Sequence, residues 1–182
     1  MTPKIRMPAL RQLPRDPDRS LWRRLLQMRE PVVYELVEDY TYTARIWGTW
    51  THMWLPRGFR SDLASTPRLS WLFGFRPDGL MMIPGLYHDW YYRHGSIEAR
   101  VAVEYEPGRW TIPFGFSTRR GGDRLFLQLA RQVTGLRLPA YAAWAALRLF
   151  GGIAWRRNEK YRRAYAETGK FQLHGDYADD GP

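Results

Sequence analysis

The stretch MMIPGLYHDWYYRHG, residues 81–95, determines how the rest of the chain has to be arranged. It is rich in aromatic residues and predicts a helix that closes on Gly95, a residue typical of the turn after a helix. Two polar residues, His88 and Asp89, lie next to each other within it. Burying a polar group without a partner costs about 2–7 kcal/mol, so other parts of the chain must supply partners for both side chains.

The length indicates a single domain, and the composition indicates a protein that contacts an anionic partner. A chain of 182 residues can bury a core without disulfides, and this chain has no cysteine, which excludes thiolate chemistry and cysteine-based zinc sites. Lysine and arginine total 28 against 18 acidic residues, and most of them are arginine, which favours bidentate contacts to phosphate or carboxylate groups. Nucleic acid, phospholipid headgroups and acidic protein surfaces all fit this charge. Nucleic acid is the least favoured, because the usual nucleic-acid-binding motifs are missing.

The chain divides into three parts. Residues 1–20 alternate prolines with basic residues and predict an extended arm, either a loose tail or a segment that orders on a neighbouring subunit. Residues 21–168 predict a single α+β domain, in which a small antiparallel sheet packs with a helical bundle. Residues 169–182 predict a loose tail. The first 20 residues lack the continuous apolar run of a signal peptide.

Strand patterns occur on both sides of the quoted stretch. Residues 31–39 and 40–50 are rich in β-branched and aromatic residues and predict an antiparallel hairpin, with residues 51–56 as a third strand. In the segment of about residues 99–116, apolar and polar residues alternate on both sides of a Pro-Gly turn, which predicts an inserted hairpin. That hairpin would either gate a site or serve as an assembly contact.

Two further helices follow. Residues 121–135, GGDRLFLQLARQVTG, carry one apolar side made of Leu125, Phe126, Leu129 and Val133 and end at a glycine. The run LPAYAAWAALRLFGGIAW, residues 138–155, has the length of a membrane span, but Arg148 lies near its centre. An arginine in mid-bilayer costs about 2.5–3.5 kcal/mol, so the run predicts a buried helix that packs under the helix of residues 81–95.

Acidic residues elsewhere in the chain are candidate partners for the His-Asp pair. Asp62 lies in a loop, and Asp123 lies in the expected first turn of the helix of residues 121–135. If the two helices pack antiparallel, Asp123 reaches His88, and an imidazole oriented by a carboxylate can act as a general base on water. Asp62 and Asp89, with loop carbonyls, would supply the hard oxygen ligands that Ca²⁺ prefers. The supporting residues are Ser65 in the same loop and Tyr92, which shares a helix face with the histidine.

Each of these acidic residues also has a purely structural interpretation. Asp89 could pair with Arg93 one helical turn away, and Asp62 lies among several arginines. Asp123 could stabilise the helix dipole, and together the residues could form a buried polar network that only holds the fold. Zinc bound by His88 and the acids is a lesser option, because His94 lies on a different side of the helix.

The order of four motifs resembles a family of tailed phages and prophages, DUF1353, which is known only as a domain of unknown function. The motifs are GFRSDLASTPR, YHDWYYRHG, GGDRLFLQLAR and AYAAWAALRLFGGIAW, and the resemblance extends over roughly residues 31 to 156. It implies a phage protein and no particular chemistry.

The HDWYY pattern is also similar to the secreted phospholipase A2 group, particularly its bacterial and fungal members. That resemblance implies that Asp62, the carbonyl of Leu63 and Asp89 bind Ca²⁺. It further implies that His88 activates water and that Asp123 orients the histidine. The chain departs from the group in having no disulfides, no glycine-rich calcium loop of the animal type, and a hairpin inserted between the histidine and the later aspartate.

The sequence therefore predicts a tailed-phage virion protein, in the tail or tail tip, that is made in the host cytoplasm and carries a Ca²⁺-dependent phospholipase A2-like hydrolase site. The alternative is a purely structural or adaptor tail protein, whose arm and aromatic and arginine surfaces bind other tail proteins. A third interpretation is a lysis-phase protein acting on the cell envelope. The first and third interpretations entail contact with phospholipid.

Overall fold

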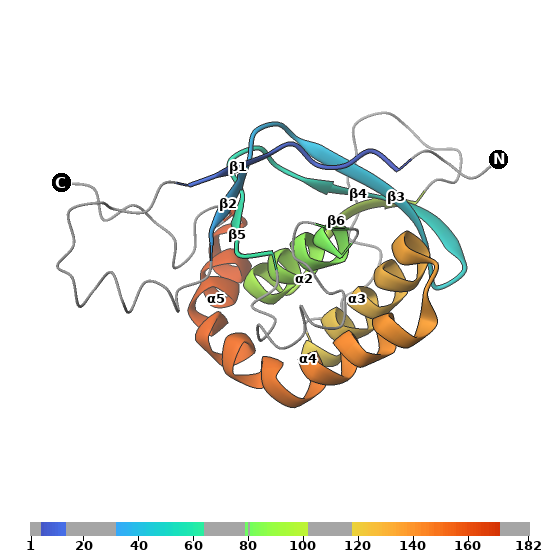
Figure 1. The fold of residues 1–182 in the computed structure, drawn as a ribbon. Coiled ribbons are helices and arrows are strands. Elements are labelled where there is room, and N and C mark those ends of the chain that lie inside the picture. Colours follow the sequence, from blue (N-terminus) through green and yellow to red (C-terminus); the bar gives the residue numbers. More distant parts are fainter. Residues whose placement is uncertain (1–4, 14–31, 64–78, 80, 102–117, 172–182) are drawn as a thin grey trace, which may run out of the picture.

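The computed structural model describes residues 5–13, 32–63, 79, 81–101 and 118–171, with strands on one side and helices on the other (Figure 1). The stretch at residues 81–95 forms helix α2 (Met82–His94), as predicted. Gly95 ends the helix in the left-handed conformation, with a φ of 76°, and its N–H donates to the carbonyl of Tyr91. Glycine adopts this φ at no steric cost, so the helix ends where its sequence indicates.

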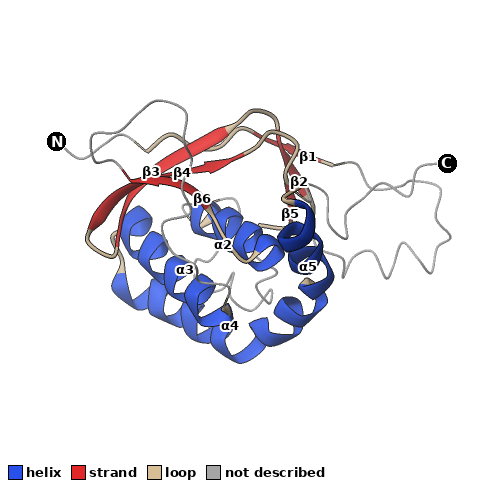
Figure 2. Cartoon of the chain, turned by 180° about the vertical axis from the view of Figure 1, so that it is seen from behind, coloured by secondary structure: helices blue, strands red, loops and turns tan. Residues whose placement is uncertain are grey.

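Helix α2 is the central element of the domain. It lies between the strands and helices α3, α4 and α5 (Figures 1 and 2), and every one of its residues except Asp89 is buried. The Tyr87 hydroxyl donates to the carbonyl of Met53 (2.8 Å) and accepts from the N–H of Tyr42 (3.1 Å), which ties the helix to two strands. The aromatic residues of the quoted stretch therefore build the core, because the helix is covered on all sides.

The strands form two small antiparallel sheets, and the α+β class is confirmed. The first sheet has the order β1 (Leu10–Gln12), β2 (Tyr34–Leu36) and β5 (Arg60–Ser61). The second has the order β3 (Tyr40–Ile46), β4 (Thr49–Leu55) and β6 (Glu98–Val101). Strand β1 belongs to the segment predicted as an arm, so part of that segment pairs with the domain.

The predicted pairing of residues 31–39 with residues 40–50 is wrong. Strand β3 pairs with β4, from Tyr40 opposite Leu55 to Ile46 opposite Thr49. The turn between them lies at Trp47 and Gly48, which have φ values of 45° and 90°. A two-residue hairpin turn requires positive φ at its centre, which a glycine provides. Strand β2 instead pairs with β1 and β5 in the other sheet.

Helix α3 (Arg119–Thr134) has the predicted apolar side and ends at Gly135. Its start differs from the prediction, because Thr118 caps the helix by accepting from the N–H of Gly121. No acidic residue lies in the first turn of α3, so Asp123 sits deeper in the helix than expected. Its role as a partner of the helix dipole is thereby weakened, since that effect falls off within the first turn.

Helix α4 (Arg137–Arg157) is followed by helix α5 (Glu159–Thr168). The prediction that α4 is buried is wrong: its buried residues are Ala140, Ala143 and Gly151, and long apolar side chains on its other face are exposed. The physical reason is that α4 lies on the outside of the domain, so one side of it, with the small residues and Trp155, packs inward and the other faces solvent. Among the described helices, none combines the length and the apolar character needed to cross a membrane.

Several predicted segments lie outside the described residues. These are parts of the predicted arm, Ser65, the part of the inserted hairpin beyond residue 101, and the predicted loose tail after residue 171. The described beginning of the inserted hairpin, β6, pairs with β4.

Candidate functional site

The packing of α2 against α3 brings His88 to Asp123. The Nε2 atom of His88 lies 3.2 Å from Oδ1 of Asp123, and both side chains are buried. The rings of Tyr92 and Phe126 lie against the imidazole, with ring centroids at 4.0 Å and 5.6 Å. An ionised carboxylate only accepts hydrogen bonds, so Nε2 carries a proton in this pair, and in the neutral form of the ring that proton leaves Nδ1 as an acceptor.

Asp123 on α3 accepts hydrogen bonds from side chains on two other helices, α2 and α4. The Tyr92 hydroxyl donates to Oδ1 (2.6 Å), and Nη1 of Arg148 on α4 donates to Oδ2 (2.6 Å). Nε of Arg119, one turn earlier on α3, lies 3.6 Å from Oδ2. Burial raises the pKa of Asp123, but the hydrogen bonds from His88, Tyr92 and Arg148 outweigh burial and bring this pKa below its ordinary value. The carboxylate is therefore ionised at neutral pH.

Two glycines allow the helices to come this close. A Cβ atom at Gly122 on α3 would lie 2.5 Å from Cδ1 of Tyr91, and one at Gly151 on α4 would lie 2.6 Å from the hydroxyl oxygen of Tyr92. Both distances are shorter than the non-bonded contacts that Cβ atoms make in folded proteins. The glycines of the later helices thus leave room for the two tyrosines that α2 presents.

On the other side of His88 lies a pair of carboxyl groups. Nδ1 of His88 is 4.0 Å from Oδ1 of Asp89, and within the described residues it makes no hydrogen bond. The pKa of Asp89 is raised well above its ordinary value, first by burial and then by the neighbouring Asp62 carboxyl group. The Asp89 side chain is 20% exposed, compared with 6% for that of His88. Solvent therefore reaches the site from the side of Asp89.

Ser61 connects the end of β5 to α2. Its hydroxyl donates to Oδ2 of Asp89 and accepts from the N–H of Leu63 (2.9 Å). Leu63 is buried and has a φ of 59°, a left-handed conformation that costs a non-glycine residue about 1–2 kcal/mol. A strained residue next to a carboxyl pair suggests a functional constraint on the path of the backbone.

The donor set at this position fits a hard cation in kind. Asp62 and Asp89 supply carboxyl oxygens, which are the ligand type that Ca²⁺ takes, and the third oxygen that the sequence predicts is the carbonyl of Leu63. In the part of the chain that is described, no three or more histidine, cysteine, aspartate or glutamate side chains gather as a metal site. A cation held here would therefore need backbone carbonyls and water for part of its coordination.

The structure thus groups the predicted residues into two connected pairs, His88 with Asp123 and Asp89 with Asp62. Ser65 lies outside the described residues. Arg93, the structural alternative as a partner for Asp89, donates to the carbonyl of Arg60 (2.9 Å), and its charge lowers the pKa of Asp89. The charge of Arg93 close to Asp89 therefore supports the structural interpretation, in which the two residues pair.

Sequence reasoning missed three members of the site: Ser61, Arg119 and Arg148. Arg148 had a usable signal, because an arginine inside an apolar run needs an anionic partner when it packs against a core. Ser61 had no signal, because its two hydrogen bonds depend on how β5 meets α2.

Comparison with known proteins identifies a family and nothing closer. No curated protein matches the chain, and neither does any solved structure. A family model described as "Protein of unknown function (DUF1353)" matches residues 34–147, a range that includes all four aspartate and histidine residues of the site. The chain therefore belongs to the DUF1353 family.

Proposed function

We propose that the protein is a Ca²⁺-dependent ester hydrolase that acts on the acyl esters of phospholipids. The observation that carries the proposal is the position of His88, which has the buried carboxylate of Asp123 on Nε2 at 3.2 Å and the partly exposed carboxyl group of Asp89 at 4.0 Å from Nδ1. An imidazole that a carboxylate orients on one nitrogen, and whose other nitrogen makes no hydrogen bond among the described residues, has the arrangement of a general base.

In the proposed reaction, Nδ1 of His88 takes a proton from a water molecule while the water oxygen forms a bond to the ester carbonyl carbon. Asp123 stabilises the imidazolium, because its carboxylate accepts the hydrogen bond from Nε2. The bond between the carbonyl carbon and the alcohol oxygen then breaks, and the leaving oxygen takes the proton back from Nδ1. The products are a carboxylic acid and an alcohol, and the histidine returns to its initial state.

Tyr92 and Arg148 support this step by holding Asp123. Their hydrogen bonds fix both carboxylate oxygens, so the imidazole has one orientation available. Asp62, Leu63 and Asp89 would hold the Ca²⁺, which when bound would polarise the ester carbonyl and stabilise the negative charge that develops on its oxygen.

The test is release of fatty acid from phospholipid vesicles, with Ca²⁺ or with EDTA. We expect release with Ca²⁺ only, and a fall of about 10²- to 10⁴-fold in His88→Ala with an unchanged circular dichroism spectrum. His52→Ala is the matched control, because His52 lies on β4 and bonds to Thr43. Equal release by the wild type and His88→Ala would refute the proposed chemistry.

As its setting, we propose a tailed-phage virion, in the tail or tail tip, on the basis of the motif resemblance alone. This setting is tested separately from the chemistry.

The second candidate is a structural or adaptor role without catalysis. The hydrogen-bond network around Asp123 favours it, because that network links three helices and would stabilise the fold without any reaction. Stoichiometric recovery of the protein from purified particles, by quantitative mass spectrometry, tests the virion setting. Recovery together with an inactive wild type would favour the adaptor role.

A further inference from the structure

The outer face of α4 is apolar along most of its length. Leu138, Leu149 and Ile153 are 82%, 76% and 67% exposed, and Ala142 and Ala145 between them are exposed too. These positions recur every three or four residues, so they lie on one side of the helix. From the first to the last of them the face extends over about 22 Å. We call these five residues, together with Phe150, the outer face of α4.

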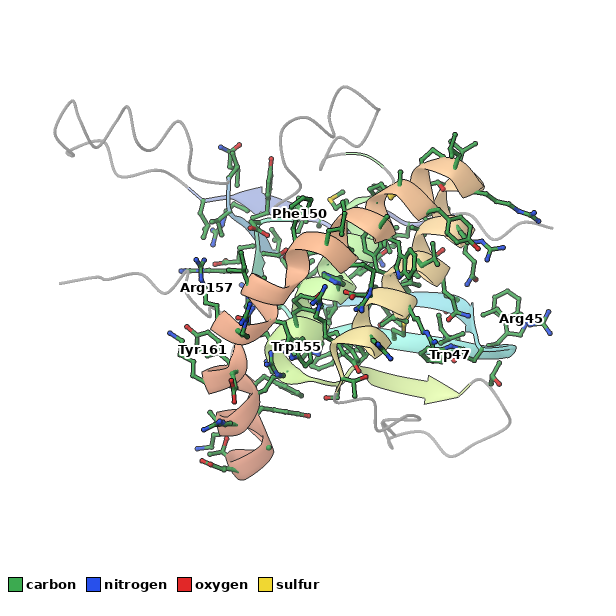
Figure 3. The ribbon with its side chains drawn as sticks, turned by 90° about the horizontal axis from the view of Figure 1, so that it is seen from below. Arg45, Trp47, Phe150, Trp155, Arg157 and Tyr161 are labelled. Atoms are coloured by element: carbon green, nitrogen blue, oxygen red, sulfur yellow. The ribbon has the colours of Figure 1, made fainter. Side chains whose placement is uncertain are left out.

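The opposite side of α4 is accounted for by packing. Ala140, Ala143 and Gly151 are buried, and Trp155 lies against Tyr92 with ring centroids at 5.1 Å. Phe150 is 64% exposed, and Figure 3 shows it on the same helix as Arg157, seen from the side of α4. The large apolar residues of the outer face therefore contribute little to the core. A contiguous exposed apolar surface of this kind marks an interaction site.

The charge of α4 identifies the kind of partner. Arginines lie at both ends of the helix, at Arg137, Arg156 and Arg157, and all three are exposed. The helix contains no aspartate or glutamate. An apolar helix face bordered by arginines matches the surface of an anionic bilayer, where apolar side chains enter the acyl boundary and guanidinium groups contact phosphates. A second copy of the chain fits less well, because it would bring like-charged arginines together in a chain of net charge +10.

The same helix takes part in the candidate site. Arg148 donates to Asp123 on the inner side of α4, and its neighbours in sequence, Leu149 and Phe150, are on the exposed side. A partner bound to the outer face of α4 would therefore be separated from the Asp123 carboxylate only by the width of that helix.

We infer that the outer face of α4 docks the protein on anionic phospholipid bilayers, with the helix lying in the plane of the membrane. The inference goes beyond the proposed function, because it concerns where the chain contacts a bilayer and not how an ester is cleaved. The binding itself requires no catalysis and can be measured without it.

The experiment is cosedimentation of the full chain with vesicles in EDTA, at physiological salt. One vesicle type is phosphatidylcholine alone, and the other also contains phosphatidylglycerol. We expect binding to be at least about tenfold stronger with phosphatidylglycerol, and to fall by about tenfold or more in the Phe150→Ser, Ile153→Ser double variant. The Arg156→Gln, Arg157→Gln double variant should lose most of the preference for the anionic vesicles.

Two control variants lie on the strand side of the domain. Trp50→Ser removes a side chain that is 51% exposed on β4, and Arg57→Gln removes an exposed arginine after that strand. Both should bind the anionic vesicles as the wild type does. Loss of binding in these controls equal to that in the α4 variants would overturn the inference. So would a lack of binding by the wild type, or equal binding to both vesicle types. Self-association of the wild type in analytical ultracentrifugation that is lost in Phe150→Ser, Ile153→Ser would also overturn it, by assigning the face to a second copy.

The docking inference and the proposed function can be refuted independently of each other. His88→Ala should bind anionic vesicles as the wild type does and release no fatty acid. A wild type that binds vesicles without hydrolysing them would refute the proposed function and support docking. A wild type that hydrolyses a short-chain ester in solution but does not bind vesicles would refute docking and support the proposed chemistry.

Discussion

Nε2 of His88 lies 3.2 Å from Oδ1 of Asp123, although the two residues are 35 positions apart and belong to different helices. Tyr92 donates to the same oxygen, and Arg148 donates to the other. One buried carboxylate thus joins α2, α3 and α4. Because it orients the histidine and holds the helices together, changes around it should affect both stability and the proposed activity.

Arg148 should contribute to stability through Asp123. In Arg148→Met, the carboxylate loses a charged hydrogen bond of 2.6 Å, and we expect the free energy of unfolding to fall by about 1–3 kcal/mol. Urea denaturation measures this value. Arg156→Met is the matched control, because Arg156 is exposed on the same helix, and its effect should stay within about 0.5 kcal/mol. Equal losses in the two variants would show that the contact with Asp123 is not stabilising.

The two neighbouring glycines of α4 should respond differently to alanine. In Gly151→Ala, the new Cβ would lie 2.6 Å from the Tyr92 hydroxyl and displace it from Asp123. We expect a net loss of about 1–3 kcal/mol in the free energy of unfolding. In Gly152→Ala, the nearest atom is Nη1 of Arg119, whose guanidinium donates to the carbonyls of Leu147 and Arg148 but can shift more easily than the Tyr92 ring. The gain in helix propensity of up to about 1 kcal/mol should offset that shift, so the net loss should be smaller than in Gly151→Ala. Thermal unfolding separates the two, and the reverse order would contradict the packing described.

His94 should make the protein less stable in mild acid. Burial lowers the pKa of His94 from 6.5 to about 3, against a hydrogen bond to the Trp90 carbonyl that raises it. The unfolded chain therefore binds a proton below pH 6.5 that the folded protein does not, and stability falls as the pH falls from 6.5 towards 3. From pH 7.5 to pH 5 this amounts to about 2 kcal/mol. In urea denaturation between pH 7.5 and pH 5, the free energy of unfolding of His94→Gln should therefore fall by about 2 kcal/mol less than that of the wild type. Equal pH dependence of the two proteins would rule out the buried neutral histidine.

Ca²⁺ should stabilise the folded protein through the carboxyl pair. At a Ca²⁺ concentration of about 100 times the dissociation constant, binding adds about 2.7 kcal/mol to the free energy of unfolding. Asp62→Asn should lose most of this increment, whereas Glu159→Gln, an exposed acid on α5, should keep it. Thermal unfolding with and without Ca²⁺ measures the difference. An increment that is unchanged in Asp62→Asn would place the ion elsewhere.

Local signals in the sequence sufficed for the helices that form the site. The helical pattern and the glycines at 95 and 135 predicted the ends of α2 and α3, because a left-handed residue stops a helix wherever it occurs. The pairing of His88 with Asp123 was predicted on the condition that the two helices pack antiparallel. The ends of the helices are determined locally, whereas that pairing depends on how α2 packs against α3.

Features that depend on tertiary contacts were not predictable in the same way. The hairpin turn at Trp47 was missed, because a tryptophan with positive φ is unusual before a glycine. The exposure of α4 was missed, because hydropathy does not reveal which face of an apolar helix is covered. Ser61 was missed because its partners come from other elements, whereas the position of Arg148 in an apolar run indicated an anionic partner without identifying it as Asp123.

In the proposed mechanism His88 and Asp123 act as one unit in hydrolysis, and a double-mutant cycle measures their coupling. The measurement is the rate of fatty acid release with Ca²⁺ for the wild type, His88→Ala, Asp123→Asn and the double variant, each checked for folding by circular dichroism. If the carboxylate acts through the imidazole, the double variant should be no slower than His88→Ala. Multiplicative losses in the double variant, or a wild-type rate in either single variant, would contradict the account.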